Sequence, residues 1–302
     1  MPAATPLPDA PGALSLRVSV ATLARVRFAH PEGGAPLLAL ERKASAARAS
    51  VPGAGVPTAH GPSAHAPTDH ASTDPGLSAY ASTVHVHAQP FGGGMRLLDQ
   101  AALQAAIGAF EFDSQRSADE DDFRLLIRPE AWAAVQQFCR EHFVDDDPVL
   151  EADPARELTE EFADALGVDL APEQYRQRPL GAWVGTRLTP TLSPRAAGRV
   201  TARIYRLFDV EILDGALART MLANSLGHTD DDLAQQALAQ AGAGGRGRAN
   251  AVLAVPLAAL TQAYLALPPE ARAAPLTFEQ HALDANVPVV LDGLALPDFR
   301  SL

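Results

Sequence analysis

The chain has few cysteines and fewer basic than acidic residues, and each shortage excludes a class of protein. Cys139 is the only cysteine among 302 residues, so an internal disulfide is impossible. No apolar run reaches the length that spans a membrane, and the first residues, MPAATPLPDAPGAL, lack the basic and apolar parts of a signal peptide. The net charge of -12 argues against binding to nucleic acid or to an anionic membrane surface. We therefore expect a cytoplasmic protein with neither of these partners.

The remaining composition is that of a globular protein with two low-complexity segments. Hydrophobic residues make up 47% and charged residues 20% of the chain, and its length suits one large domain or two small ones. Residues 1–13 are rich in Pro and Ala, which predicts a disordered tail. Residues 44–83 are dominated by Ala, Pro, Ser, Thr, Gly and His without periodicity, and we expect little order there.

The clearest single element is an amphipathic helix over residues 153–167. Asp153 is a good N-cap, Pro154 suits the first helical position, and Gly167 can adopt the left-handed conformation that ends a helix. Apolar residues recur at helical spacing and predict a buried stripe, which consists of Leu158, Phe162, Ala165 and Leu166.

The opposite face of this helix carries four carboxylates, at Glu157, Glu160, Glu161 and Asp164. Acidic side chains three and four residues apart repel one another, which costs stability. A hard divalent cation, Mg2+ or Mn2+, would offset the repulsion, because it prefers carboxylate oxygens and binds phosphate at its remaining positions. The alternative interpretation is a solvated acidic face near the N-terminal half of a helix, where the helix dipole favours anions.

The order of residues on this helix resembles a known motif. Arg156-Glu157-Leu158-Thr159-Glu160-Glu161 is similar to the R-E-U-x-E-E core of the Nudix box, where U is a bulky aliphatic residue. The resemblance implies that Glu160 and Glu161 are the main metal ligands, that Glu157 assists them, and that Arg156 orients the glutamates. The upstream positions of the full box hold His142 and Pro148, so the similarity covers the core of the motif.

Other segments agree with the order of elements in that family. Residues 14–29 and 36–43 predict two strands joined by a Pro-Glu-Gly-Gly turn. The three glycines at Gly92, Gly93 and Gly94 follow a strand and would let the backbone approach a substrate closely. Residues 180–188 and 200–213 predict two further strands. Arg203 and Tyr205 on the second could meet a phosphate or stack on a base, or could simply be surface residues. Residues 250–263 predict a strand and a helix, and residues 277–286 a last helix.

These elements predict an α+β fold, a Nudix-like mixed sheet sandwiched between helices. Residues 14–302 would form a single domain with insertions at about 44–83, 95–150 and 214–249. We expect the segment 95–150 to be a helical insertion over the mouth of the active site. The segment 214–249 is also predicted to be helical.

The function that the resemblance implies is hydrolysis of the diphosphate in a nucleoside diphosphate derivative, with Mg2+ or Mn2+. Arg156, Glu157, Glu160 and Glu161 would be the catalytic residues, and Glu211 or the run at Asp230–Asp232 would supply a general base. One alternative is an inactive Nudix-like domain that binds a nucleotide or a protein partner. An unrelated helical interaction protein is a third possibility, which the many strand-like runs disfavour.

Overall fold

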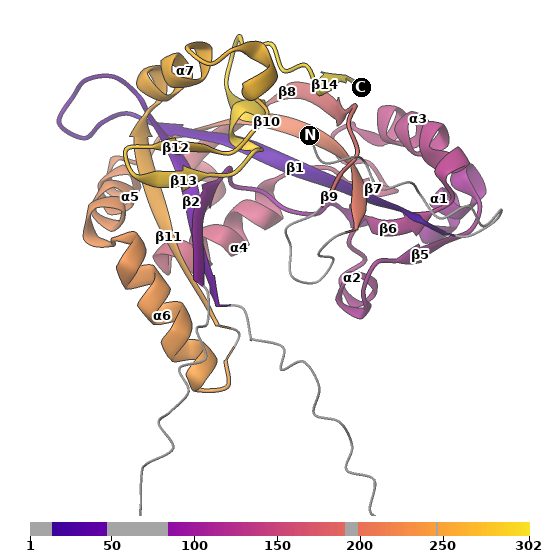
Figure 1. The fold of residues 1–302 in the computed structure, drawn as a ribbon, viewed down its shortest axis with the longest axis horizontal. Coiled ribbons are helices and arrows are strands. Elements are labelled where there is room, and N and C mark those ends of the chain that lie inside the picture. Colours follow the sequence, from indigo (N-terminus) through magenta and orange to yellow (C-terminus); the bar gives the residue numbers. More distant parts are fainter. Residues whose placement is uncertain (1–13, 47–83, 191–198, 246) are drawn as a thin grey trace, which may run out of the picture.

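The strand β1 (Leu16–Phe28) lies at the centre of a mixed sheet in the computed structural model, which describes residues 14–46, 84–190, 199–245 and 247–302 (Figure 1). β10 (Val200–Ile212) runs parallel to β1 along its length, from the pair Arg17–Thr201 to the pair Phe28–Ile212. β2 (Leu37–Ala46) pairs antiparallel with the end of β1. The predicted hairpin is confirmed, as is the predicted strand over 200–213.

The sheet extends outward from this central pair of strands. Its main order is β12 (Leu276–Phe278), β13 (His281–Leu283), β3 (Val84–Gln89), β2, β1, β10, β8 (Tyr175–Gly185) and β14 (Phe299–Ser301). β11 (Arg248–Pro256) pairs antiparallel along β2, and β9 (Thr189–Pro190) pairs with β10.

A glycine turn lies where β1 and β2 diverge. β2 contacts β1 only over Leu37–Ala39, and β3 then takes the place of β1 beside β2. After β3 the chain crosses back to β1, where the N–H of Thr22 donates to the carbonyl of Gly93 at 2.9 Å. The split between the two central strands is therefore filled by residues 91–94, of which Phe91 contributes a buried ring and the three glycines contribute backbone alone.

Helices cover both faces of the sheet. Because side chains alternate along β1, successive residues of this strand pack on helices of opposite faces. Its residues Ala24, Val26 and Phe28 pack on α4 (Ala155–Leu166) and α5 (Gly215–Gly227). On the opposite face, Ala21 and Leu23 pack on the short helix η4 (Val287–Val290). α7 (Leu257–Leu265) and α6 (Asp230–Gly242) cover this second face further along, over β2 and β11. The predicted mixed sheet flanked by helices is confirmed at this level.

The segment 95–150 contains helices, as predicted, and also short strands, which were not predicted. It comprises β4 (Arg96–Leu97), α1 (Gln100–Ile107), β5 (Phe110–Phe112), α2 (Gln115–Asp119), β6 (Arg124–Ile127), η1 (Pro129–Ala131), α3 (Trp132–His142) and β7 (Leu150–Glu151). β6 pairs with the first residues of β1, because that edge would otherwise carry unpaired backbone groups. α1 and α3 pack on Val18 and Val20, on the same face of β1 as α4.

The C-terminal part of the chain confirms two predictions and overturns one. Residues 214–249 do form helices, α5 and α6, and β11 leads directly into α7. The helix predicted at 277–286 is instead the hairpin of β12 and β13. Glu279 and Gln280 at its turn have φ of 47° and 74°, which a helix does not allow. The short helices η2 (Pro172–Gln174) and η3 (Pro269–Ala271) lie in connections.

Two predictions from the sequence concern residues outside the described ranges. These are the tail at 1–13 and, from residue 47 onward, the insertion at 44–83. Among the helices of the described ranges, none combines the length and the apolar character needed to cross a bilayer.

Candidate functional site

The helix α4 forms much as the sequence predicts and sets the position of its acidic residues. It begins at Ala155, whose N–H donates to Oδ1 of Asp153 at 2.7 Å. Gly167 ends it in the left-handed conformation, with φ of 66°. The predicted apolar stripe is buried at Leu158 and Phe162, and Phe162 contacts the ring of Phe91 with centroids 5.0 Å apart. This packing places the first turns of α4 directly against the glycine turn.

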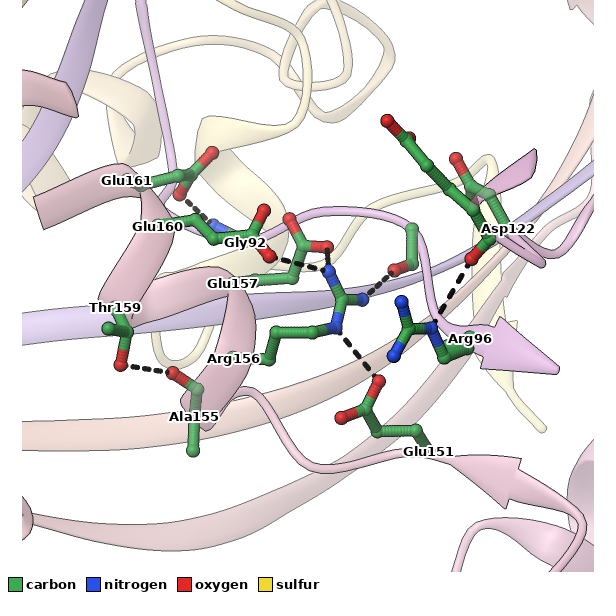
Figure 2. A network of polar contacts seen from close by, with 12 residues as sticks. Gly92, Arg96, Asp122, Glu151, Ala155, Arg156, Glu157, Thr159, Glu160 and Glu161 are labelled. Atoms are coloured by element: carbon green, nitrogen blue, oxygen red, sulfur yellow. Dashed lines mark hydrogen bonds and ion pairs between the residues drawn. The ribbon is translucent and has the colours of Figure 1, made fainter. Parts of the chain in front are cut away.

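Two glutamates of α4, one helical turn apart, face that glycine turn (Figure 2). Glu161 accepts a hydrogen bond from the N–H of Gly92 at 2.5 Å. Gly93 approaches Glu157 so closely that a β-carbon at Gly93 would stand 1.7 Å from Oε2 of Glu157. Gly92 has φ of 130°, and a β-carbon there would stand 2.2 Å from the carbonyl oxygen of Thr22. Glycine is therefore needed at both positions for the carboxylates and the backbone to meet.

Arg156 holds the start of the acidic face together. Its guanidinium contacts Glu151 at 2.8 Å, Glu157 at 2.6 Å and Glu160 at 3.2 Å, and it donates to the carbonyl of Gly94 at 3.0 Å. Burial alone would lower the pKa of Arg156, but the carboxylates of Glu151 and Glu157 outweigh burial and raise that pKa. The arginine thus stays charged and bridges the helix, β7 and the glycine turn (Figure 2).

The three glutamates of the motif have different environments. The side chain of Glu160 is 60% exposed, whereas those of Glu157 and Glu161 are 16% and 9% exposed. Burial raises the pKa of Glu157; Glu160 adds to this rise, and Arg156 opposes it. Burial also raises the pKa of Glu161 well above its ordinary value, and the adjacent carboxylate of Glu41 raises it further. Both buried glutamates therefore hold their protons more tightly than a glutamate in water does.

A second pair of charged residues reaches Glu161 from β2. Nζ of Lys43 lies 2.6 Å from Oε2 of Glu41 and 3.1 Å from Oε1 of Glu161. Burial would lower the pKa of Lys43, but Glu161 and Glu41 outweigh it and raise that pKa above its ordinary value. The two carboxylates and one ammonium form a triad between β2 and α4.

Asp122 approaches the glycine turn from the inserted segment. A β-carbon at Gly94 would stand 1.8 Å from Oδ1 of Asp122, and Oδ2 contacts Arg124 at 2.5 Å. Asp122 is 7% exposed, and its Oδ1 has no hydrogen-bond partner among the described residues. Burial raises the pKa of Asp122, although Arg124 opposes the shift. Although Asp122 belongs to the acidic run at 119–122, it is therefore buried rather than solvated.

The proposed general bases do not join this group. Glu211 contacts Arg27 at 3.2 Å and Arg176 at 2.5 Å. On β10 it lies five residues beyond Arg206, the register partner of Thr22, which is roughly 16 Å at about 3.3 Å per residue. Asp230 contacts Arg42 at 3.3 Å on the face of β2 opposite to Glu41.

The two β10 residues predicted to bind substrate also lie elsewhere. Arg203 and Tyr205 alternate with Ile204, whose side chain packs on the face that α4 and α3 cover. Tyr205 is buried on the opposite face, where its hydroxyl donates to Oδ1 of Asn286 at 2.8 Å. Arg203 donates to Oγ1 of Thr189 at 2.5 Å and is occupied by the neighbouring strand β9. Of the predicted site residues, those on α4 and the glycine turn come together, and those on β10 do not.

Glu41, Lys43 and Asp122 also surround the turn, although no motif in the sequence marks them. One signal for the first two was available, since Glu41 and Lys43 continue the period-two pattern of an apolar strand, at positions where Leu37 and Ala39 face α4. Asp122 offered no comparable signal, because it is brought to the turn by the pairing of β6 with β1.

Within the described ranges, no three His, Cys, Asp or Glu side chains converge in the way that would hold a metal ion. Arg156 and Lys43 form ion pairs with the carboxylates. Comparisons of the chain with protein-family models, with curated proteins and with solved structures give no match.

Proposed function

We propose that the chain is a hydrolase of the Nudix type, which uses Mg2+ or Mn2+ to cleave the diphosphate of a nucleoside diphosphate derivative. The observation that carries this proposal is the contact between the acidic face of α4 and the glycine turn. Glu157 and Glu161 meet Gly93 and Gly92 directly, in the order Arg-Glu-Leu-Thr-Glu-Glu that resembles the core of the Nudix box. The mixed sheet with helices on both faces agrees with the same family.

The residues around the turn suit a hard divalent cation. Oε1 of Glu41 and Oδ1 of Asp122 are buried carboxylate oxygens without a hydrogen-bond partner among the described residues. Buried oxygens of this kind are costly unless a donor or a cation satisfies them. The resemblance assigns the cation to Glu157, Glu160 and Glu161, whose side chains would have to draw together around it, since they do not converge on one point in the described ranges. The cation, when bound, neutralises phosphate oxygens and lowers the pKa of a water molecule.

Three groups of the chain, at Arg156, Gly92 and Glu157, would have defined roles in this reaction. Arg156 orients Glu157 and Glu160 by ion pairs and ties them to the carbonyl of Gly94. The N–H of Gly92 fixes the carboxylate of Glu161. Burial raises the pKa of Glu157, and a cation held by that carboxylate would favour its ionised form.

A second candidate function is a binding module that has lost hydrolysis. The observation that favours it is the pairing of the acids with the chain's own cations, Glu157 with Arg156 and Glu161 with Lys43. A site neutralised in this way needs no metal to be stable. Such a module would bind a nucleotide or a protein partner on the same surface.

The experiment that separates the two functions is a screen of nucleoside diphosphate derivatives with Mg2+ or Mn2+, with phosphate release as the readout. Glu161→Gln should abolish hydrolysis and most of the rise in melting temperature that Mg2+ causes by mass action. Glu173→Gln, an exposed change on η2, is the matched control and should keep both. Absence of hydrolysis across the screen, with equal responses to Mg2+ in wild type and Glu161→Gln, would favour the binding module.

A further inference from the structure

Glu41 is a carboxylate in the interior of the sheet. It pairs with Gln89 of β3 on one side and with Val252 of β11 on the other. Its side chain is 1% exposed, and Oε1 has no hydrogen-bond partner among the described residues. An ionised group in such a position is costly unless it is paired and fully hydrogen-bonded. Oε1 of Glu41 is therefore available to a further positively charged partner.

Lys43 supplies one positive charge to two carboxylates. Its Nζ lies between Oε2 of Glu41 and Oε1 of Glu161, at 2.6 Å and 3.1 Å. When both carboxyl groups are ionised, they and the ammonium sum to a net charge of -1, which a divalent cation in place of the ammonium would change to zero. Lys43 is 31% exposed, so its flexible stem has a path toward solvent. It is also the only lysine of the chain.

We propose that Glu41 and Glu161 together bind a divalent cation, Mg2+ or Mn2+, and that the ammonium of Lys43 occupies their shared position in the cation-free protein. Mg2+ is commonly bound by one or two carboxylates, with water and phosphate oxygens as its other ligands. Two protein carboxylates suffice for this mode. The inference rests on the proposed function through Glu161, but Glu41 lies outside the motif on α4.

The proposal makes Lys43 a competitor of the cation, which separates it from a purely structural ion triad. Loss of Glu41 removes a ligand, so cation affinity falls. Loss of Lys43 removes a competing charge, so cation affinity rises. In a purely structural triad, both changes would lower stability. The two changes would then not shift cation affinity in opposite directions.

The first experiment is calorimetric titration of the full chain with MnCl2 and MgCl2. Glu41→Gln should weaken binding at least tenfold, in the range seen when residues around a metal are changed. Lys43→Met, which keeps the length and the apolar stem, should tighten binding by about tenfold. Glu32→Gln, an exposed glutamate in the turn between β1 and β2, is the control and should bind as wild type does. Unchanged affinity in both Glu41→Gln and Lys43→Met would overturn the proposal.

A second measurement needs no variant and remains decisive if the substitutions impair folding. Because Lys43 is the only lysine, protein labelled with 13C-lysine gives a single set of lysine side-chain signals. Addition of MgCl2 should move the Cε signal of Lys43 in a saturable manner as the ammonium leaves the two carboxylates. A signal that stays in place at saturating Mg2+ would overturn the proposal.

These measurements separate this inference from the proposed function. Cation binding that depends on Glu41 and Lys43, without hydrolysis of any compound in the screen, would support the inference and defeat the hydrolase. Hydrolysis that persists in Glu41→Gln with unchanged cation affinity would support the hydrolase and defeat the inference.

Discussion

Gly93 lies against the carboxylate of Glu157, and a β-carbon at Gly93 would come within 1.7 Å of Oε2. The neighbouring Gly92 lies against the backbone of Thr22, where a β-carbon would come within 2.2 Å of the carbonyl oxygen. The two contacts differ in what must move. At Gly93 the end of a flexible side chain can yield, whereas at Gly92 the obstacle is a central strand. A substitution at Gly93 should therefore affect mainly function, and one at Gly92 mainly stability.

Gly93→Ala should displace the carboxylate of Glu157 at a cost of about 1 kcal/mol in the free energy of unfolding, a typical value for a single substitution. The rate of metal-dependent hydrolysis should fall strongly, although this loss in the free energy of unfolding is small. Gly92→Ala should lose about 3 kcal/mol or more, because it adds backbone strain at a φ of 130° to a steric clash. Urea unfolding of both variants, together with their activity, measures this contrast. Equal losses of stability would contradict it.

Arg156→Ala should destabilise the protein by about 2 kcal/mol, because it leaves Glu151, Glu157 and Glu160 without their common cation. Arg156→Lys should recover less than half of this loss, since a single ammonium cannot reproduce the planar guanidinium contacts. Arg140→Ala on the exposed side of α3 is the control and should change stability by less than about 0.5 kcal/mol. Full recovery by lysine would show that charge alone matters.

Asp209 should contribute to the loss of folding stability at acid pH. It is 2% exposed and contacts Arg25 at 2.8 Å, Arg27 at 3.0 Å and Arg178 at 3.1 Å. Burial alone would raise the pKa of Asp209, but the hydrogen bonds from Arg27 and Arg25 outweigh burial and lower that pKa. A lowered pKa in the folded state means that this contribution is present above the unfolded value, about 3.9, and is lost as pH falls through the folded value.

We therefore expect Asp209→Asn to lose about 3 kcal/mol at pH 7, as breaking a buried ion pair does. The difference from wild type should shrink below about pH 4, when wild-type Asp209 also becomes protonated. Urea unfolding at pH 7, 5, 4 and 3 measures both effects. Asp298→Asn, at the pair with the exposed Arg187, should cost less than about 1 kcal/mol. A difference that stays constant down to pH 3 would contradict the assignment.

Gln280→Gly should stabilise the hairpin of β12 and β13 by up to about 1 kcal/mol. Gln280 has φ of 74°, and a two-residue hairpin turn with positive φ favours glycine. Thr277→Gly in the adjoining strand is the control and should lose about 0.5–1 kcal/mol, because glycine there adds freedom only to the unfolded chain. The free energy of unfolding of the two variants should change in opposite directions.

The helix α4 was predictable because its signals are local. Asp153, Gly167 and the apolar stripe lie within fifteen residues, and their spacing alone indicates a helix and its buried face. The hairpin of β1 and β2 follows for the same reason, from two apolar runs around a glycine turn. The helix predicted at 277–286 was wrong because the segment is short and its turn, at Glu279 and Gln280, carries no glycine to mark it.

What the sequence by itself determined is thus the acidic helix, its motif and the presence of a glycine turn. Only the tertiary structure decided which charges surround them. Glu41 and Asp122 reach the turn because β1 and β2 diverge there and β6 pairs with the free edge of β1. Glu211 and Tyr205 are excluded by position along β10 and by the face on which they lie. Pairing between strands distant in sequence brings charges together, and neither composition nor periodicity records that pairing.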